Sequence, residues 1–275
     1  MYEMKKLFPK IIPRKSSIGN IIVMVLVAGT FSCLSGCALN GASAKAPDQG
    51  IPLAGDEYHE IDERTRLQDF PIFDPDKPAV IKRGNKDRKM VALTIDDGWS
   101  KDDRILNLLE EHAIRCTVFP IGGRGVAEEN PDWIERMDAD GFEICTHTYS
   151  HYKLTDRPEQ WVIDDIRKGQ DVIAEVTGKR YPYMRPPGGF YDEAVIRAAA
   201  ENDCYLVLWT SEVGDTRNGI TVDQEVNAVL SNLCNGNIIL CHFGGINTFN
   251  ALERLVPEIK ACGYEFGTLT ELLAP

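Results

Sequence analysis

Five short clusters of polar residues carry side chains that could bind a metal or transfer a proton. They occupy residues 94–98, 147–151, 185–189, 209–216 and 240–242. His147 and His151 are four residues apart, so a helical turn would point both imidazoles to one side, as a divalent metal requires. Asp96 and Asp97 are adjacent carboxylates that close the first expected strand, where a turn with a helix-capping Asp is the ordinary explanation. Each cluster alone has an ordinary structural explanation, such as a turn or a core histidine, but the five clusters together, in this order, indicate a functional site.

The elements that must position these clusters follow a strand–helix alternation from residue 80 onward. Strands are expected at 90–95, 116–119, 142–145, 205–209, 237–241 and 265–266, with a further short strand that ends at 184. Helices are expected at 103–112, 132–139, 160–176, 192–202, 223–233 and 250–262. Such alternation predicts an α/β fold with a parallel sheet and helices outside it. The polar clusters then lie at the carboxyl ends of the strands, where these folds bind ligands. The segment is shorter than the roughly 250 residues of an eight-unit barrel, which leaves a smaller barrel or an open doubly wound sheet.

The composition indicates a globular chain with a sizeable core. Of 275 residues, 43% are hydrophobic and 26% charged, which excludes a collagen-like or wholly disordered protein. The formal net charge of −12 argues against nucleic acid as a partner, because binding to phosphate backbones needs a basic face. We expect a monomer.

The first 36 residues are typical of an export signal. A basic start precedes an apolar run at 21–31, which is shorter than the roughly 20 residues that a spanning helix needs. The sequence Leu34-Ser35-Gly36-Cys37 resembles the lipobox of bacterial lipoproteins. This resemblance implies cleavage before Cys37, lipidation of Cys37 and an extracytoplasmic protein anchored to the bacterial cell membrane. An ordinary secretory signal with an incidental cysteine, or an uncleaved anchor, remains an alternative.

Residues 37–78 are expected to form a tether between the anchor and the globular domain. They are rich in Ala, Gly, Pro and charge and have no sustained periodicity. The end of this tether, 69–75, is expected to lie against the domain without regular structure. Six cysteines follow, at positions 116, 145, 204, 234, 241 and 262; export permits disulfides, and buried free thiols are equally compatible with their spacing.

The clusters, in this order, resemble those of the polysaccharide deacetylases of the NodB-homology type, carbohydrate esterase family 4. The resemblance covers about residues 79 to 273, includes the lead-in at 82–85 and the late stretch 259–266, and is strongest to bacterial peptidoglycan deacetylases. It implies a distorted (β/α) barrel with fewer than eight units and assigns 79–275 as the catalytic domain. Members of this family hydrolyse N- or O-acetyl groups on sugars.

The resemblance also implies a metal site and a general base. Asp97, His147 and His151 would bind a divalent metal, with zinc as the first expectation and cobalt or nickel as alternatives. Asp96 would take the proton of the metal-activated water, and Arg185 would hold Asp96 ionised.

The remaining implied roles concern the leaving group and the substrate. His242 would protonate the leaving amine, with Asp215 orienting it and raising its pKa. The backbone N–H of Gly188 would help to stabilise the oxyanion, and Trp209 would lie on the substrate side of the site.

Several positions depart from the family pattern; the one at Ile95 should matter little, and the others affect substrate grip more than catalysis. Ile95 replaces the usual Phe, Gly188 stands where an aromatic residue is common, Thr216 replaces a Trp, and Glu212 replaces an Asp. The expected substrate is an N-acetylated polysaccharide, either peptidoglycan or a chitin-like glycan. An O-acetyl esterase of the xylan type and a non-catalytic, carbohydrate-binding surface lipoprotein are the alternatives.

Overall fold

The apolar segment that leads to Asp96 and Asp97 forms the central strand of the fold. The computed structural model describes residues 73–75, 77 and 79–275. Strand β2 (Met90–Asp97) is almost entirely buried and pairs in parallel with β3 (Thr117–Pro120) on one side and β8 (Asn237–Phe243) on the other. A strand covered on both faces is apolar along its whole length rather than at alternate residues. The continuous run at 90–95 therefore predicted this strand correctly.

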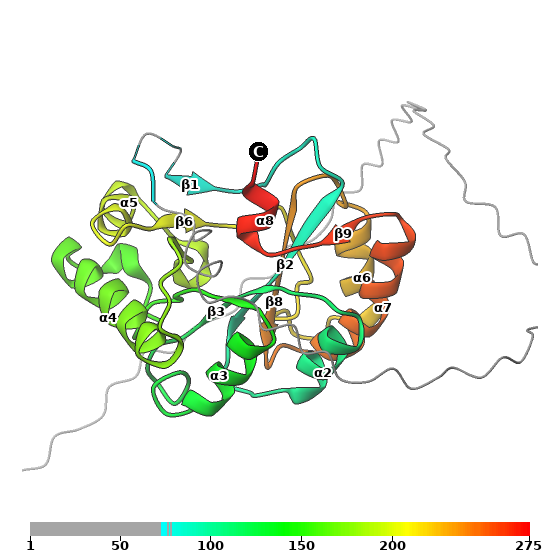
Figure 1. The fold of residues 1–275 in the computed structure, drawn as a ribbon, viewed down its shortest axis with the longest axis horizontal. Helices are drawn as coiled ribbons and strands as arrows, with labels where there is room; N and C mark the ends of the chain where they lie inside the picture. Colours follow the sequence, from blue (N-terminus) through cyan, green and yellow to red (C-terminus); the bar gives the residue numbers. More distant parts are fainter. Residues whose placement is uncertain (1–72, 76, 78) are drawn as a thin grey trace, which may run out of the picture. The chain divides into compact units, whose positions relative to one another are not determined.

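All strand pairs in the described chain are parallel, and they fall into two sheets. The larger sheet has the order β4 (Glu143–Ile144), β3, β2, β8, β7 (Ser211–Glu212), with β9 (Glu265–Phe266) paired to the start of β2. The smaller sheet has the order β1 (Val80–Ile81), β6 (Tyr205–Val207), β5 (Tyr183–Met184). A parallel bridge between Thr146 and Met184 joins the edges of the two sheets. The result is the distorted (β/α) barrel that the sequence predicted (Figure 1).

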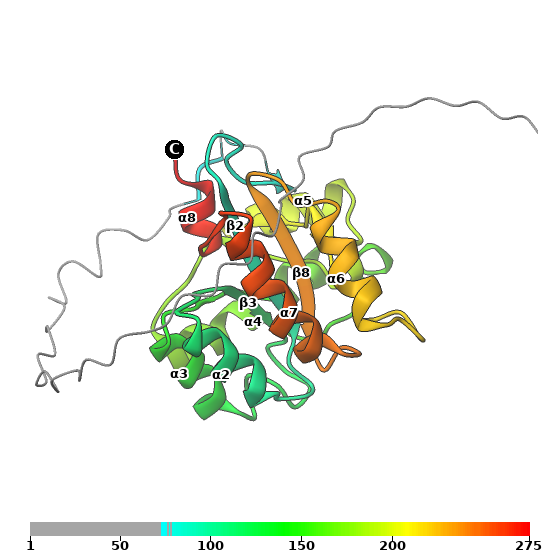
Figure 2. The ribbon, with the colours of Figure 1, turned by 90° about the vertical axis from the view of Figure 1, so that its right-hand side faces the viewer.

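Helices cover the outside of these sheets, as the strand–helix alternation predicted. They are α2 (Asp103–Glu111), α3 (Pro131–Ala139), α4 (Glu159–Thr177), α5 (Glu193–Ala200), α6 (Val222–Leu230), α7 (Thr248–Ala261) and the short α8 (Leu269–Leu273). Figure 2 shows α6 and α7 beside β8. Side-chain caps fix several helix starts: Asp102 accepts from the backbone N–H of Arg104, Asp192 from that of Val195, and Thr221 forms a capping box with Gln224.

Three short elements were missed, and two strands are shorter than expected. β1 and β7 have only two residues each and α8 only five, so none of them shows a periodicity that sequence analysis could detect. β4 covers only Glu143–Ile144 of the expected 142–145. β6 ends at Val207, and Leu208 and Trp209 continue into the polar loop. The turns η1 (Leu154–Asp156) and η2 (Pro187–Gly189) are 3₁₀ turns and were not predicted.

The end of the expected tether contacts the domain. The ring of Phe73 lies 4.9 Å from that of Tyr205, and the backbone N–H of Asp74 donates to the Tyr205 hydroxyl at 2.8 Å. Residues 73–75 have no helix or strand, as predicted for this part. The export signal, Cys37 and the rest of the tether lie outside the described residues and remain predictions. Within the described part, no helix is both long and apolar enough to cross a bilayer.

The six cysteines of the described chain are all free. Cys116, Cys145, Cys204 and Cys241 are buried, and burial raises the pKa of each thiol. Of the two alternatives that the spacing left open, the structure shows free thiols.

Candidate active site

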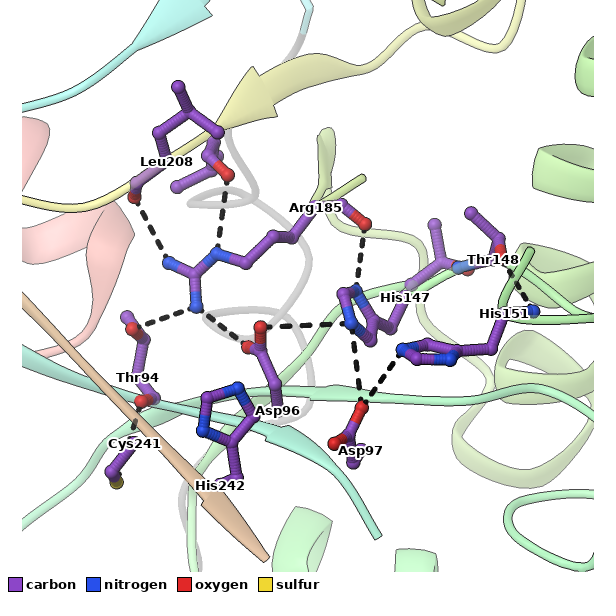
Figure 3. A network of polar contacts seen from close by, with 12 residues as sticks. Thr94, Asp96, Asp97, His147, Thr148, His151, Arg185, Leu208, Cys241 and His242 are labelled. Carbon is purple, nitrogen blue, oxygen red and sulfur yellow. Dashed lines mark hydrogen bonds and ion pairs between the residues drawn. The ribbon is translucent and has the colours of Figure 1, made fainter. Parts of the chain in front are cut away.

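The five polar clusters meet at the carboxyl ends of the strands. The parallel register sets Asp96 of β2 opposite His242 of β8, and Asp97 opposite Pro120 at the end of β3. His147 follows the bridge at Thr146, and Arg185 follows β5. Figure 3 shows these side chains converging from separate strands. Residues that are up to about 150 positions apart in the chain thus share one site.

Asp97, His147 and His151 form a compact group of metal-ligand atoms. One ligand atom from each residue lies within 4.8 Å of the other two. The Oδ1 atom of Asp97 is 3.6 Å from Nε2 of His147 and 3.2 Å from Nε2 of His151. This oxygen is buried and has no hydrogen bond of acceptable geometry within the described residues. Two nitrogens and one oxygen at this spacing suit a divalent cation that keeps further positions open.

The hydrogen bonding of His147 supports a cation between these groups. Its Nδ1 lies 2.8 Å from the carbonyl oxygen of Arg185, and a carbonyl can only accept, so Nδ1 carries the proton. Burial lowers the pKa of His147 despite the opposing charges of Asp96 and Asp97. The ring is therefore neutral, and its Nε2 lone pair faces the carboxylate oxygen of Asp97. Two lone pairs facing each other in a buried site are unfavourable without a cation between them.

The segment that carries both histidines is a loop, so the expected helical turn is wrong. Thr148 and His151 have φ angles of 66° and 53°, which a helix does not allow. The Thr148 hydroxyl accepts from the backbone N–H of His151 at 3.2 Å and stabilises this conformation. The backbone of α4 also comes close, since a Cβ at Gly169 would lie 2.4 Å from the Thr146 hydroxyl. The loop brings the two imidazoles together without helical geometry.

Asp96 is held from one side by a fully buried arginine. Nη1 of Arg185 donates to Oδ1 of Asp96 at 2.7 Å and to the Thr94 hydroxyl at 2.9 Å, while Nε and Nη2 donate to the carbonyl oxygens of Val207 and Leu208. Arg185 is 0% exposed, so its charge acts on Asp96 with little screening. The second oxygen of Asp96, Oδ2, lies 3.8 Å from Nε2 of His147 and faces the metal-ligand group.

His242 is oriented by Asp215. Nδ1 of His242 lies 2.8 Å from Oδ1 of Asp215, while Oδ2 of Asp215 accepts from the His242 backbone N–H at 2.8 Å and from the Thr248 hydroxyl at 2.7 Å. Burial lowers the pKa of His242, but the hydrogen bond with Asp215 and the charge of Asp96 outweigh it and raise the pKa to about 9. His242 is therefore protonated at neutral pH, and Nε2 is its free donor.

Gly188 lies in a left-handed turn that an aromatic side chain covers. Its φ is 65°, and a Cβ there would come within 2.8 Å of the Phe190 ring. Phe190 is 52% exposed. The Trp209 ring packs against the next residue, Gly189. A Cβ at Gly189 would lie 2.7 Å from that ring. Phe190 thus provides an aromatic surface next to the position where Gly188 lacks one.

Two supporting residues were not assigned a role from the sequence. Thr94 binds Arg185 through its hydroxyl and donates to the carbonyl oxygen of Ile239 at 2.7 Å. The Thr248 hydroxyl donates to Oδ2 of Asp215, the oxygen that also accepts from the His242 backbone N–H. Thr94 stands within the first polar cluster, two residues before Asp96, which was a usable signal. Thr248 begins α7 outside all five clusters, and the sequence carried no signal for it.

Comparison with known proteins decides the family. A family model described as polysaccharide deacetylase matches residues 83–207. The peptidoglycan-N-acetylglucosamine deacetylase of Bacillus cereus is 34% identical over 192 residues, which cover 67% of this chain and 88% of that protein. The chain belongs to the polysaccharide deacetylase family. It is a hydrolase of that family, and the family is metal-dependent.

Solved structures of family members confirm the fold of this deacetylase. The Bc1960 peptidoglycan N-acetylglucosamine deacetylase superposes with a TM-score of 0.67 at 30% identity, over 71% of this chain and 92% of that one. A BA3943 mutant, described as a family 4 pseudoenzyme with restored enzymatic activity, gives a TM-score of 0.68 at 29% identity over 72% of each chain. The resemblance inferred from the five clusters is thereby confirmed, as is the distorted barrel.

Proposed function

We propose that this deacetylase removes acetyl groups from the N-acetylated sugars of peptidoglycan or a chitin-like glycan. The observation that carries the proposal is the pairing of Asp96 and His242 at matched positions of β2 and β8, beside the group formed by Asp97, His147 and His151. A base and an acid on neighbouring strands can act on the same acetamido group. The activities named for the Bacillus cereus relative and for Bc1960 support peptidoglycan as the substrate.

Asp96 would act as the general base. Arg185 occupies Oδ1, so Oδ2 is the oxygen that can take a proton from the attacking water. As the water oxygen bonds to the acetyl carbon, its proton passes to Asp96. The buried ion pair fixes the carboxylate in position before the reaction, which reduces the reorganisation that the transition state requires.

His242 would act as the general acid. Its Nδ1 is held by Asp215, so Nε2 can give its proton to the sugar nitrogen as the carbon–nitrogen bond breaks. Acetate and a free amine are the products. An amine leaves poorly without a proton, and the raised pKa keeps His242 charged for this step.

Asp97, His147 and His151 would hold the metal. When bound there, a divalent ion such as zinc supplies Lewis acidity toward water and the acetyl carbonyl. The chain itself contributes the orientation of these ligands, since the Arg185 carbonyl fixes the tautomer of His147 and the Thr148 hydroxyl fixes the loop at His151.

The substrate class can be tested by measuring acetate released from chitooligosaccharides and peptidoglycan, with acetylated xylan as the comparison. We expect release from the N-acetylated glycans to exceed release from xylan. Faster release from xylan would favour an O-acetyl esterase. Glycan binding without acetate release from any substrate would favour the non-catalytic alternative.

Asp215→Asn is expected to shift the pH profile of turnover. The raised pKa of His242 keeps it protonated up to about pH 9, so the wild-type rate should fall only as the pH passes that value. Removing the Asp215 charge leaves burial as the main influence, which lowers the pKa of His242. The alkaline limb of kcat should therefore move to lower pH, and pH–rate profiles of the two proteins test this. An unmoved limb would contradict the proposed role of Asp215.

We also propose that Cys37 is lipidated and anchors the protein outside the cytoplasm, as the lipobox-like sequence suggests. A Cys37→Ala variant should lose lipid label and be released from the membrane, because the apolar run at 21–31 is short for a spanning helix. Cys33→Ala is the matched control and should keep the label. Equal labelling of the wild type and the Cys37 variant would contradict the proposal.

A further inference from the structure

The side chains of Arg124 and Arg157 both contact the ring of one exposed tyrosine, Tyr152, which follows His151 at the edge of the site. The guanidinium carbon of Arg157 lies 4.4 Å from the centre of the Tyr152 ring, and that of Arg124 lies 5.2 Å from it. Tyr152 is 43% exposed and directly follows His151 in the chain. Arg124 also donates to the carbonyl oxygen of Ser150 at 3.0 Å. The cluster of Arg124, Tyr152 and Arg157 is thus built into the loop that carries the metal-ligand histidines.

The loop after β3 holds Arg124 in this position. The backbone N–H groups of Gly122 and Gly123 donate to the carbonyl oxygens of Thr148 and Tyr149, each at 2.9 Å. These bonds align the segment before Arg124 with the loop that leads to His151. The backbone that carries Arg124 is therefore held against the loop that carries His151.

Neither arginine of the cluster has a carboxylate partner among the described residues, although the chain carries a net charge of −12. Other exposed arginines do: Arg104 pairs with Asp102, Arg197 with Glu159 and Arg254 with Asp223. The nearby acids are engaged elsewhere, since Asp156 pairs with Lys153 and Glu128 accepts from the Tyr149 hydroxyl. Two cations at one aromatic ring, without a carboxylate counter-ion, attract an anion from outside the chain.

We propose that Arg124, Tyr152 and Arg157 form a subsite for a carboxylate on the glycan, next to the sugar that loses its acetyl group. A guanidinium over an aromatic ring can still donate from its in-plane N–H groups, and these match the two oxygens of a carboxylate. Nη1 of Arg124 donates to Ser150, which leaves its other N–H groups for a ligand. The Tyr152 ring offers a surface for the neighbouring sugar or substituent. This inference rests on the proposed function and narrows its substrate class to acidic glycans, such as those with a carboxylate on the sugar or on an attached peptide.

Binding can be measured in an Asp96→Asn background, so that little substrate is turned over during the measurement. The ligands are a muramic-acid-containing oligosaccharide with its peptides, the same oligosaccharide after peptide removal, and a neutral chitooligosaccharide of equal length. Arg124→Gln/Arg157→Gln should raise the Kd for an acidic ligand by at least about tenfold, as for lost charged hydrogen bonds, and leave the neutral ligand unchanged. A defect that persists after peptide removal assigns the carboxylate to the sugar, and one that disappears assigns it to the peptide.

The control is Lys86→Gln/Lys89→Gln, which removes the same charge. Both lysines are exposed and precede β2, at the opposite end of that strand from the site, and Lys89 lies over the Tyr264 ring. The control should bind all three ligands normally. Equal weakening toward neutral and acidic ligands, or none toward either, would overturn the subsite. Retained neutral binding shows that the arginine variant is folded, and acetate release by the wild type tests the proposed function separately.

Discussion

Asp96→Asn and His242→Ala are each expected to keep full metal content and to lose turnover by roughly 10²–10⁴-fold, the usual range for a positioned base or acid. Neither residue belongs to the metal-ligand group of Asp97, His147 and His151. Metal analysis together with kcat on an N-acetylated oligosaccharide checks both parts of the prediction. A variant that lost metal along with turnover would show that its residue helps to bind the ion.

The two variants should differ in their dependence on the leaving group. An alcohol leaves more easily than an amine, so the His242→Ala defect should be smaller on an activated acetyl ester than on an N-acetyl sugar. Asp96→Asn should impair both substrates, because both need the attacking water to lose a proton. Asp156→Asn and His112→Ala are matched controls: Asp156 is exposed on the rim, and His112 caps α2. If His242→Ala hydrolysed both substrates at the wild-type rate, His242 would not be the general acid.

His147→Ala and His151→Ala are each expected to lower both metal retention and activity strongly. Each removes one of the three side chains whose ligand atoms gather in the site, and two remaining ligands hold a divalent ion poorly. His147→Ala should have the larger effect, because this ring is buried and its tautomer is fixed by the Arg185 carbonyl. Metal content after dialysis measures the loss.

The control for the histidine variants is again His112→Ala. Circular dichroism should show that each variant keeps its fold, since both rings lie at the end of the barrel rather than in an apolar cluster. An unchanged metal stoichiometry in either histidine variant would contradict the assignment of that residue.

The sequence predicted the site more successfully than it predicted the local backbone. Asp96 and His242 could be brought together because parallel strands end at one edge, and the observed register sets them opposite each other. The backbone between His147 and His151 was mispredicted, because spacing alone does not separate a helical turn from a loop. Its left-handed residues, Thr148 and His151, are stabilised by contacts with α4 that are distant in the chain.

Features that depend on how turns and loops fold were also missed. Gly188 stands where an aromatic residue is common in the family, yet the Phe190 ring covers the space beside it. Side-chain direction in a turn depends on φ and ψ, which residue type does not determine for a glycine. The contacts of Arg124 and Arg157 with the Tyr152 ring likewise depend on how two loops pair. No spacing in the sequence indicates these contacts.

The most direct test of the account is a metal titration of the purified mature domain. Metal-free protein is incubated with chitooligosaccharide and with peptidoglycan while zinc, cobalt or nickel is added in turn, and acetate and free amine are measured together. We expect no release without metal, and equal amounts of acetate and amine that rise until one ion is bound per chain. Equal release of acetate by the metal-free protein, or no release with any of the three metals, would contradict a metal-dependent deacetylase activity.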